Sequence, residues 1–131
     1  MEKIMLLEDV NLSEIQFTKD GKNVHFDFID MYEGKPIASL ICEDVLHLIY
    51  SNCFDDKDYG FACYVGEVTV QTFTLDKDIV QELHTMEYQF YDMGGNILVR
   101  HNKLHIVEIE GGEVSIKVSC KKLPDLHRFK S

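Results

Sequence analysis

Short segments in which apolar and polar residues alternate recur along the chain. Residues 24–29 place their apolar side chains at every second position, namely Val24, Phe26 and Phe28. Residues 113–120 repeat the pattern with Val114, Ile116, Val118 and Cys120. A period of two is typical of a strand that buries one face and leaves the other in water. The pattern therefore predicts a chain built mainly from β-strands.

Glycine-containing turn signals separate these segments. Asp20-Gly21, Gly94-Gly95 and Gly111-Gly112 each lie between two apolar runs, and Glu33-Gly34-Lys35-Pro36 forms a fourth signal. Two-residue hairpin turns need positive φ angles, which glycine adopts without steric penalty. Because hairpins join antiparallel neighbours, we expect an antiparallel meander of about seven or eight strands.

Residues 61–75 keep the strand character but change phase. Cys63 and Val65 share one parity, whereas Val68 and Val70 share the other. Gly66 stands where the phase changes, and an extra residue or a kink at a glycine has this effect in strands. The sequence predicts a β-bulge or a bend at Gly66.

Two segments have helical spacing instead. Val45, Leu46 and Ile49 fit one face of a helix over residues 43–52, and two acids at its start suit the helix dipole. A second, shorter helix is predicted over residues 77–84. The expected class is α+β: a predominantly antiparallel β meander with one or two short helices packed on one side. A partly closed β-barrel or a sandwich is the alternative.

Length and charge limit the function classes. The 131 residues are expected to form one domain, residues 1–131, without a linker or repeat. The net charge of −10 argues against nucleic acid and against an anionic membrane as partners. Residues 121–131 carry four basic residues against one acid, so the first 120 residues carry −13. We expect residues 121–131 to be a basic tail that frays from the domain.

The chain start and the cysteines suggest a cytoplasmic protein of bacterial type. The first apolar stretch is shorter than the core of a signal peptide, and no apolar run is long enough to span a membrane. Cysteines in a reducing compartment are free thiols and commonly behave as small core residues. This is the expectation for all four, which are Cys42, Cys53, Cys63 and Cys120.

No known motif that carries chemistry occurs in the sequence. The sequence has no phosphate-binding loop, dinucleotide fingerprint, nucleophile elbow or zinc-protease motif. His101 and His105 would lie roughly 13 Å apart along a strand, too far for one metal ion. The acidic residues 55–58 fail the register of a calcium loop. We therefore predict no cofactor, no metal site and no catalytic residue.

Two pairs of polar residues remain as candidate site residues. Glu43 and His47, followed by Ser51, would form a column on the predicted helix and could hold the imidazole for acid–base chemistry. His25 and Asp27 share one strand face, where the carboxylate could raise the histidine pKa. For each pair, the favoured interpretation is the ordinary solvated face of its element.

These observations support two hypotheses of different classes. The first is a small, acidic, non-enzymatic interaction module whose partner is a basic protein or a second copy of the chain. The alternative is a small-molecule-binding protein or small enzyme with a pocket between sheet and helices.

Overall fold

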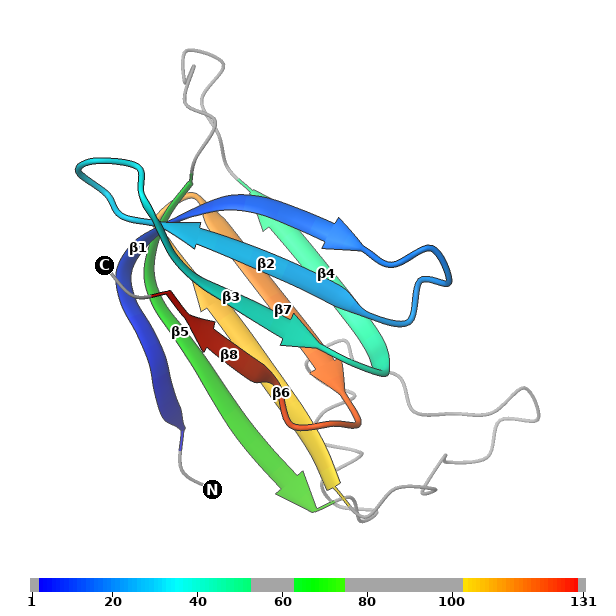
Figure 1. The fold of residues 1–131 in the computed structure, drawn as a ribbon. Coiled ribbons are helices and arrows are strands. Elements are labelled where there is room, and N and C mark those ends of the chain that lie inside the picture. The colour runs from blue at the N-terminus through cyan, green and yellow to red at the C-terminus, as the bar shows by residue number, and fades with distance from the viewer. Residues whose placement is uncertain (1–2, 53–62, 75–102, 130–131) are drawn as a thin grey trace.

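The computed structural model describes residues 3–52, 63–74 and 103–129, and the regular secondary structure of this part of the chain consists of β-strands alone (Figure 1). Eight strands form one antiparallel sheet in the order β4-β7-β6-β5-β1-β2-β3-β8. Their bounds are β1 Ile4–Phe17, β2 Val24–Ile29, β3 Pro36–Cys42, β4 Val45–Asn52, β5 Cys63–Thr74, β6 Lys103–Glu110, β7 Val114–Cys120 and β8 Asp125–Arg128.

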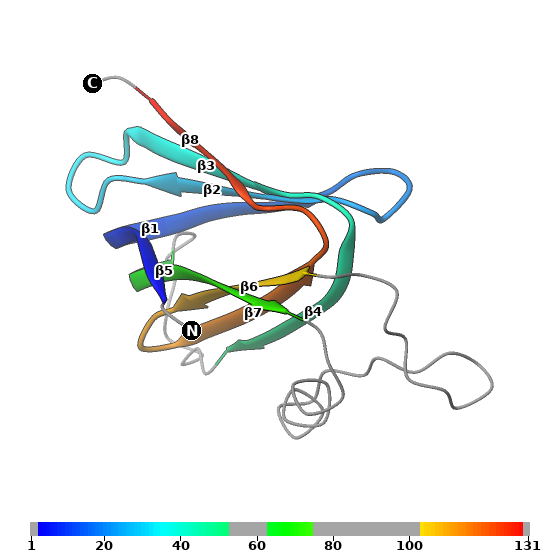
Figure 2. The same cartoon turned by 90° about the horizontal axis from the view of Figure 1, so that it is seen from below.

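The sheet folds over on itself, so that its two halves face each other as layers. Figure 2 shows β2, β3 and β8 in one layer and β4, β5, β6 and β7 in the other. Strand β1 serves both layers, because residues 11–17 pair with β2 and residues 4–12 pair with β5. Among the described residues the sheet is not closed into a barrel, because its order begins at β4 and ends at β8.

Irregularities in β1 let one strand serve both layers. The register shifts once between Met5 and Leu7 and again between Leu12 and Glu14. Between these points, Asp9 has a φ of 49°. An extra residue in one strand bends it and increases its twist. The hydroxyl of Ser13, the extra residue of the second shift, donates to the carbonyl oxygen of Asp27 at 3.1 Å.

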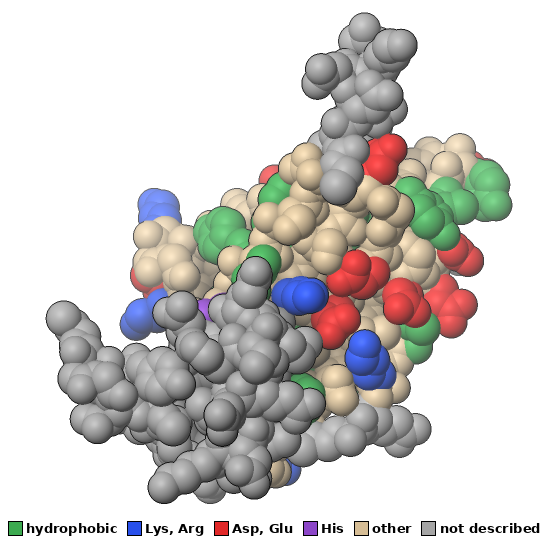
Figure 3. All heavy atoms as spheres, turned by 180° about the vertical axis from the view of Figure 1, so that it is seen from behind, with side chains coloured by type: hydrophobic (Ala, Val, Ile, Leu, Met, Phe, Trp, Pro, Cys, Tyr) green, Lys and Arg blue, Asp and Glu red, His purple; other side chains and the backbone are tan. Residues whose placement is uncertain are grey.

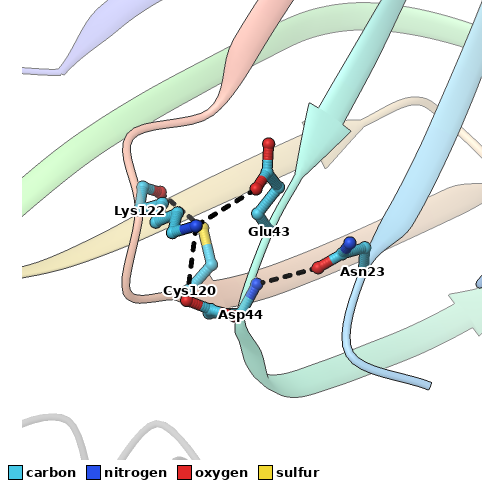
Figure 4. Close-up of polar contacts among 5 residues, drawn as sticks. All are labelled: Asn23, Glu43, Asp44, Cys120 and Lys122. Atoms are coloured by element: carbon cyan, nitrogen blue, oxygen red, sulfur yellow. Dashed lines mark hydrogen bonds and ion pairs between the residues drawn. The ribbon is translucent and has the colours of Figure 1, made fainter. Parts of the chain in front are cut away.

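A two-residue corner carries the chain from β3 to β4 and thus between layers. Its second residue, Asp44, has a φ of 53°. The Asp44 N–H donates to Asn23 Oδ1 at 3.1 Å, and the Asp44 carbonyl accepts from the Lys121 N–H at 3.1 Å. The Val45 N–H donates to the Lys22 carbonyl at 2.8 Å. Figure 4 shows this corner beside the end of β7.

The core lies between the two layers and is apolar. Phe26, Phe28, Leu40, Ile109 and Ile116 are its largest fully buried side chains. The predicted alternation is confirmed in β2 and, apart from the buried Ser119, in β7. Cys42 and Cys120 are free and buried in this core, as expected. The neighbouring Cys120 thiol first, and burial second, raise the pKa of Cys42. Cys42 therefore remains a protonated thiol.

The predicted α+β class is wrong, because no helix occurs in the described residues. Residues 45–52 form the edge strand β4, which pairs with β7. The register shifts between Val45 and His47, and both Val45 and Leu48 pack on the core. Leu46 is the extra residue of this shift. Because of it, two successive residues that face the core, Val45 and Leu48, are three positions apart instead of two, and this spacing resembles that of a helix. The helix predicted over 77–84 lies outside the described residues.

The change of phase in β5 is real, but its mechanism differs from a bulge at Gly66. Val65 and Val68 are both buried. Strand β5 pairs with β6 without any shift, and its pairing with β1 is regular on both sides of Gly66. The register places Asp9, with its positive φ, opposite Gly66. The irregular backbone therefore belongs to β1.

The predicted turns that lie in the described residues are confirmed, but at Gly111-Gly112 glycine is needed for a reason other than a positive φ. Gly21 and Gly34 have φ angles of 72° and 71°, whereas Gly111 and Gly112 have no positive φ. A Cβ atom on Gly111 would lie 2.0 Å from the carbonyl oxygen of Tyr64. This turn needs glycine because another strand passes close to it. The Gly94-Gly95 turn lies outside the described residues.

Part of the segment expected to fray is ordered. Residues 125–128 form β8, which pairs with residues 38–41 of β3. The Phe129 N–H adds a hydrogen bond of 2.8 Å to the Ile37 carbonyl. Leu126 packs against the core, and this apolar contact explains why the segment is ordered.

As for membranes, the described residues contain no helix with the length and apolarity to cross one.

The close approach at Gly111 predicts a strong difference between two neighbouring glycines. Gly111→Ala should lower the free energy of unfolding by about 2–3 kcal/mol, because the Tyr64 backbone cannot move aside without disturbing β5. Gly112 has open space around its Cα, so Gly112→Ala should change stability by less than about 0.5 kcal/mol. Urea unfolding of both variants measures this difference, and equal losses would contradict it.

Candidate functional site

The predicted pair His25 and Asp27 lies on the outer face of β2. Both side chains are half-buried. The Ser39 hydroxyl donates to Asp27 Oδ1 at 2.5 Å, whereas no hydrogen bond joins His25 to Asp27 in the described structure. The two residues share a face, as predicted. The Asp27 carboxylate is hydrogen-bonded to Ser39 of β3 and not to the His25 imidazole.

Glu43 and His47 are not a helical column, because β4 is a strand. Glu43 sits in the corner, where its carboxylate lies 3.3 Å from Lys122 Nζ. Lys122 Nζ also lies 3.9 Å from the Asp44 carboxylate. Figure 4 shows Lys122 beside both acidic residues. All three side chains are partly exposed, so these ion pairs contribute at most about 1 kcal/mol each. Glu43 therefore has a structural partner of its own.

His47 has a partner that sequence reasoning missed. Its Nδ1 lies 2.8 Å from the hydroxyl oxygen of Ser119 on β7, the residue directly opposite. A serine beside an imidazole is the arrangement of an activated nucleophile. Ser119, however, has no exposed surface. A substrate cannot reach this oxygen, so the contact fixes β4 against β7.

A second hydroxyl–imidazole contact lies between β5 and β6. Thr72 Oγ1 is 2.8 Å from His105 Nδ1, and His105 is buried. Burial first, and the positive charge of Lys103 second, lower the pKa of His105. The histidine is therefore neutral at neutral pH. Its sequence neighbour in the HxxxH spacing, His101, lies outside the described residues.

Surface hollows lined by described residues include two that contain none of the four candidate residues. One, of about 480 Å³, is lined by residues 5–10, Ile37 and Arg128. The other, of about 260 Å³, is lined by Lys22, residues 44–46 and Lys121. The described His, Cys, Asp and Glu residues form no group of three that could hold a metal ion.

The feature that the register does assemble is a row of three carboxylates. Glu8 on β1 pairs with Glu67 on β5, and Glu67 pairs in turn with Glu110 on β6. The inward neighbours Leu7, Val68 and Ile109 are buried, which places all three glutamates on the outer face. We call Glu8, Glu67 and Glu110 the acidic row.

The acidic row is not neutralised within the described part of the chain. None of its members forms an ion pair there, and Glu110 accepts only the Ser115 hydroxyl at 2.9 Å. The neighbouring Glu108 differs, because Lys3 Nζ lies 3.5 Å from its carboxylate. Figure 3, which views the molecule from behind, shows acidic side chains gathered on one area with basic side chains beside them.

One further acid lies next to the row. The Tyr64 hydroxyl donates to Asp9 Oδ1 at 2.5 Å, and this contact is the first cause of the raised pKa of Tyr64. The positive φ of Asp9 and the bend of β1 place Asp9 beside Tyr64 of β5. The three glutamates lie 59 and 43 positions apart in the sequence. Only strand pairing brings them together, so no local signal could have found the row.

Comparisons with known proteins place the chain in a family and support its fold. Residues 5–125 match a family model whose description reads only "-like" and states no activity. The chain belongs to this family. The crystal structure of an uncharacterized protein from Neisseria gonorrhoeae is similar, with a TM-score of 0.63 and 21% identity. The match covers 96% of this chain and 97% of that one. No curated protein matches the sequence.

The acidic row predicts a stabilising substitution. Glu67 lies between two carboxylates, and like charges directly opposite each other destabilise a sheet. Glu67→Gln should raise the free energy of unfolding by about 0.5 kcal/mol at low ionic strength, and salt should reduce the gain. The control Asp125→Asn removes one charge from β8 and should leave stability unchanged. A destabilised Glu67→Gln protein would contradict the repulsion.

The buried histidine predicts a loss of stability in mild acid. Because the pKa of His105 is lowered by folding, the unfolded chain takes up the proton first as the pH falls through about 6.5. The free energy of unfolding should therefore decrease between about pH 7 and pH 5. His105→Gln should flatten this decrease, whereas His127→Gln, at an exposed position, should not. Denaturant unfolding at several pH values measures the slopes.

Proposed function

We propose that this member of the family is a non-enzymatic interaction module whose acidic row docks a basic protein partner. The observation that carries the proposal is the alignment of Glu8, Glu67 and Glu110 across three neighbouring strands. Cross-strand pairs of like charge oppose folding, so the stability of the domain does not account for them. Lysines or arginines of a partner would remove the repulsion on binding.

The treatment of the other acids supports the choice of this face. Glu43 and Glu33 each form an ion pair with a lysine. Asp30 accepts two backbone N–H groups in the β2–β3 turn. The acidic row has no comparable partner in the described residues. A group of unneutralised carboxylates accelerates association with an oppositely charged surface and makes binding sensitive to salt.

The alternative, a pocket for a small molecule, has less support. It expected convergence of His25, Asp27, Glu43 and His47 at a pocket. His25 and Asp27 lie on the outer face of β2, whereas Glu43 lies in the β3–β4 corner and His47 on β4. Each hydrogen bond or ion pair seen for Asp27, Glu43 and His47 joins neighbouring elements. The cytoplasm is the proposed compartment, because Cys42 and Cys120 are free thiols.

Affinity capture with two variants of equal charge tests the proposal. One variant is Glu8→Gln, Glu67→Gln and Glu110→Gln; the other is Glu14→Gln, Glu33→Gln and Asp125→Asn. Wild type and the second variant should retain the same basic protein at low salt, and the first variant should retain at most about a tenth as much. Equal retention by both variants would show that net charge alone acts, and would overturn the assignment to the acidic row.

A further inference from the structure

The larger surface hollow is a groove along the part of β1 that, among the described residues, has a neighbouring strand on one side only. Residues 4–10 pair with β5, whereas pairing with β2 begins at Asn11. Six consecutive residues of this segment, 5–10, line the groove. Ile37 of β3 and Arg128 of β8 form the opposite wall. A strand segment without a second neighbour presents backbone N–H and carbonyl groups that can pair with another chain.

One contact shows that the backbone of β1 faces into this groove. The Arg128 guanidinium donates from Nη2 to the carbonyl oxygen of Leu6 at 2.6 Å, across the groove. Leu6 is the extra residue at the first register shift of β1. Bulges and charged side chains are devices that keep an unpaired edge from uncontrolled pairing. Leu6 and Arg128 provide both devices here.

The chemistry of the groove favours a peptide that is both apolar and basic. Leu6, Leu7, Val10 and Ile37 pack on or belong to the core, and they make the floor apolar. Glu8 and Asp9 are exposed and give the rim negative charge. Glu8 is also the first member of the acidic row, so the groove and the row are continuous.

We propose that the groove binds an extended peptide segment of the basic partner, which adds to the free edge of β1 as a further strand. This inference rests on the proposed function and specifies how the partner binds. Strand addition takes affinity from backbone hydrogen bonds and specificity from alternate side chains. Alternation places apolar residues of the segment toward the floor and lysines or arginines toward Glu8 and the acidic row.

A synthetic peptide of alternating lysine and valine, about seven residues long, is a suitable probe because the six groove residues of β1 extend over roughly 20 Å. Two further peptides carry N-methyl groups on alternate amides, one in each phase. The phase that faces β1 should lose at least about tenfold in affinity, because two or more hydrogen bonds are lost. The other phase should bind as the parent peptide does.

Protein variants locate the peptide independently. Arg128→Ala frees the Leu6 carbonyl and removes a like charge, so the peptide should bind at least about threefold more tightly. Lys19→Ala removes the same charge from the β1–β2 turn and should change affinity less. Amide chemical-shift changes on titration should be largest in residues 5–10.

The outcomes separate this inference from the proposed function. If both methylated peptides bind like the parent, or if shifts concentrate at Glu67 and Glu110, strand addition is overturned. A peptide that fails to bind at low salt, or weaker binding by Arg128→Ala, also overturns it. In each case capture of the basic protein by wild type, but not by the acidic-row variant, would leave the proposed function standing.

Discussion

The short corner between β3 and β4 is the constraint on which the folded sheet depends. These strands lie six positions apart in the sheet order, which in a flat sheet would separate them by roughly 29 Å. Three Cα–Cα steps lead from Cys42 to Val45, and these reach at most about 11 Å. The sheet must therefore fold until its ends meet. The short connection from β7 to β8 imposes the same condition, and both connections meet at the Asp44–Lys121 hydrogen bond.

Folding the sheet creates both the core and the outer surfaces. The inward faces of β1, β2, β3, β5, β6 and β7 are buried between the layers, while the outer faces point to water or to partners. Strand β1 makes this geometry possible through its two register shifts and the positive φ of Asp9. Within the part of the chain that the structure describes, the same irregular backbone leaves residues 4–10 with one neighbouring strand. The groove is thus a direct consequence of how β1 serves two layers.

The acidic row and the groove give one surface two complementary properties. Carboxylates act over a long range and guide a basic partner, whereas a strand edge acts only at contact and selects an extended segment. Both features are unfavourable for an isolated domain, because one repels itself and the other exposes polar backbone. Their occurrence side by side, joined at Glu8, is the physical basis for assigning recognition to this part of the molecule.

The sequence by itself determined the antiparallel strands, the turns at Gly21 and Gly34, and the buried faces of β2 and β7. These depend on local alternation and on φ angles, which neighbouring residues set. The strand character of residues 45–52 depended on pairing with β7, since a bulge changed their spacing to that of a helix. His47 and Ser119, like Glu8, Glu67 and Glu110, are far apart in sequence. Only the tertiary structure decided these contacts, because register between distant strands follows from packing the common core.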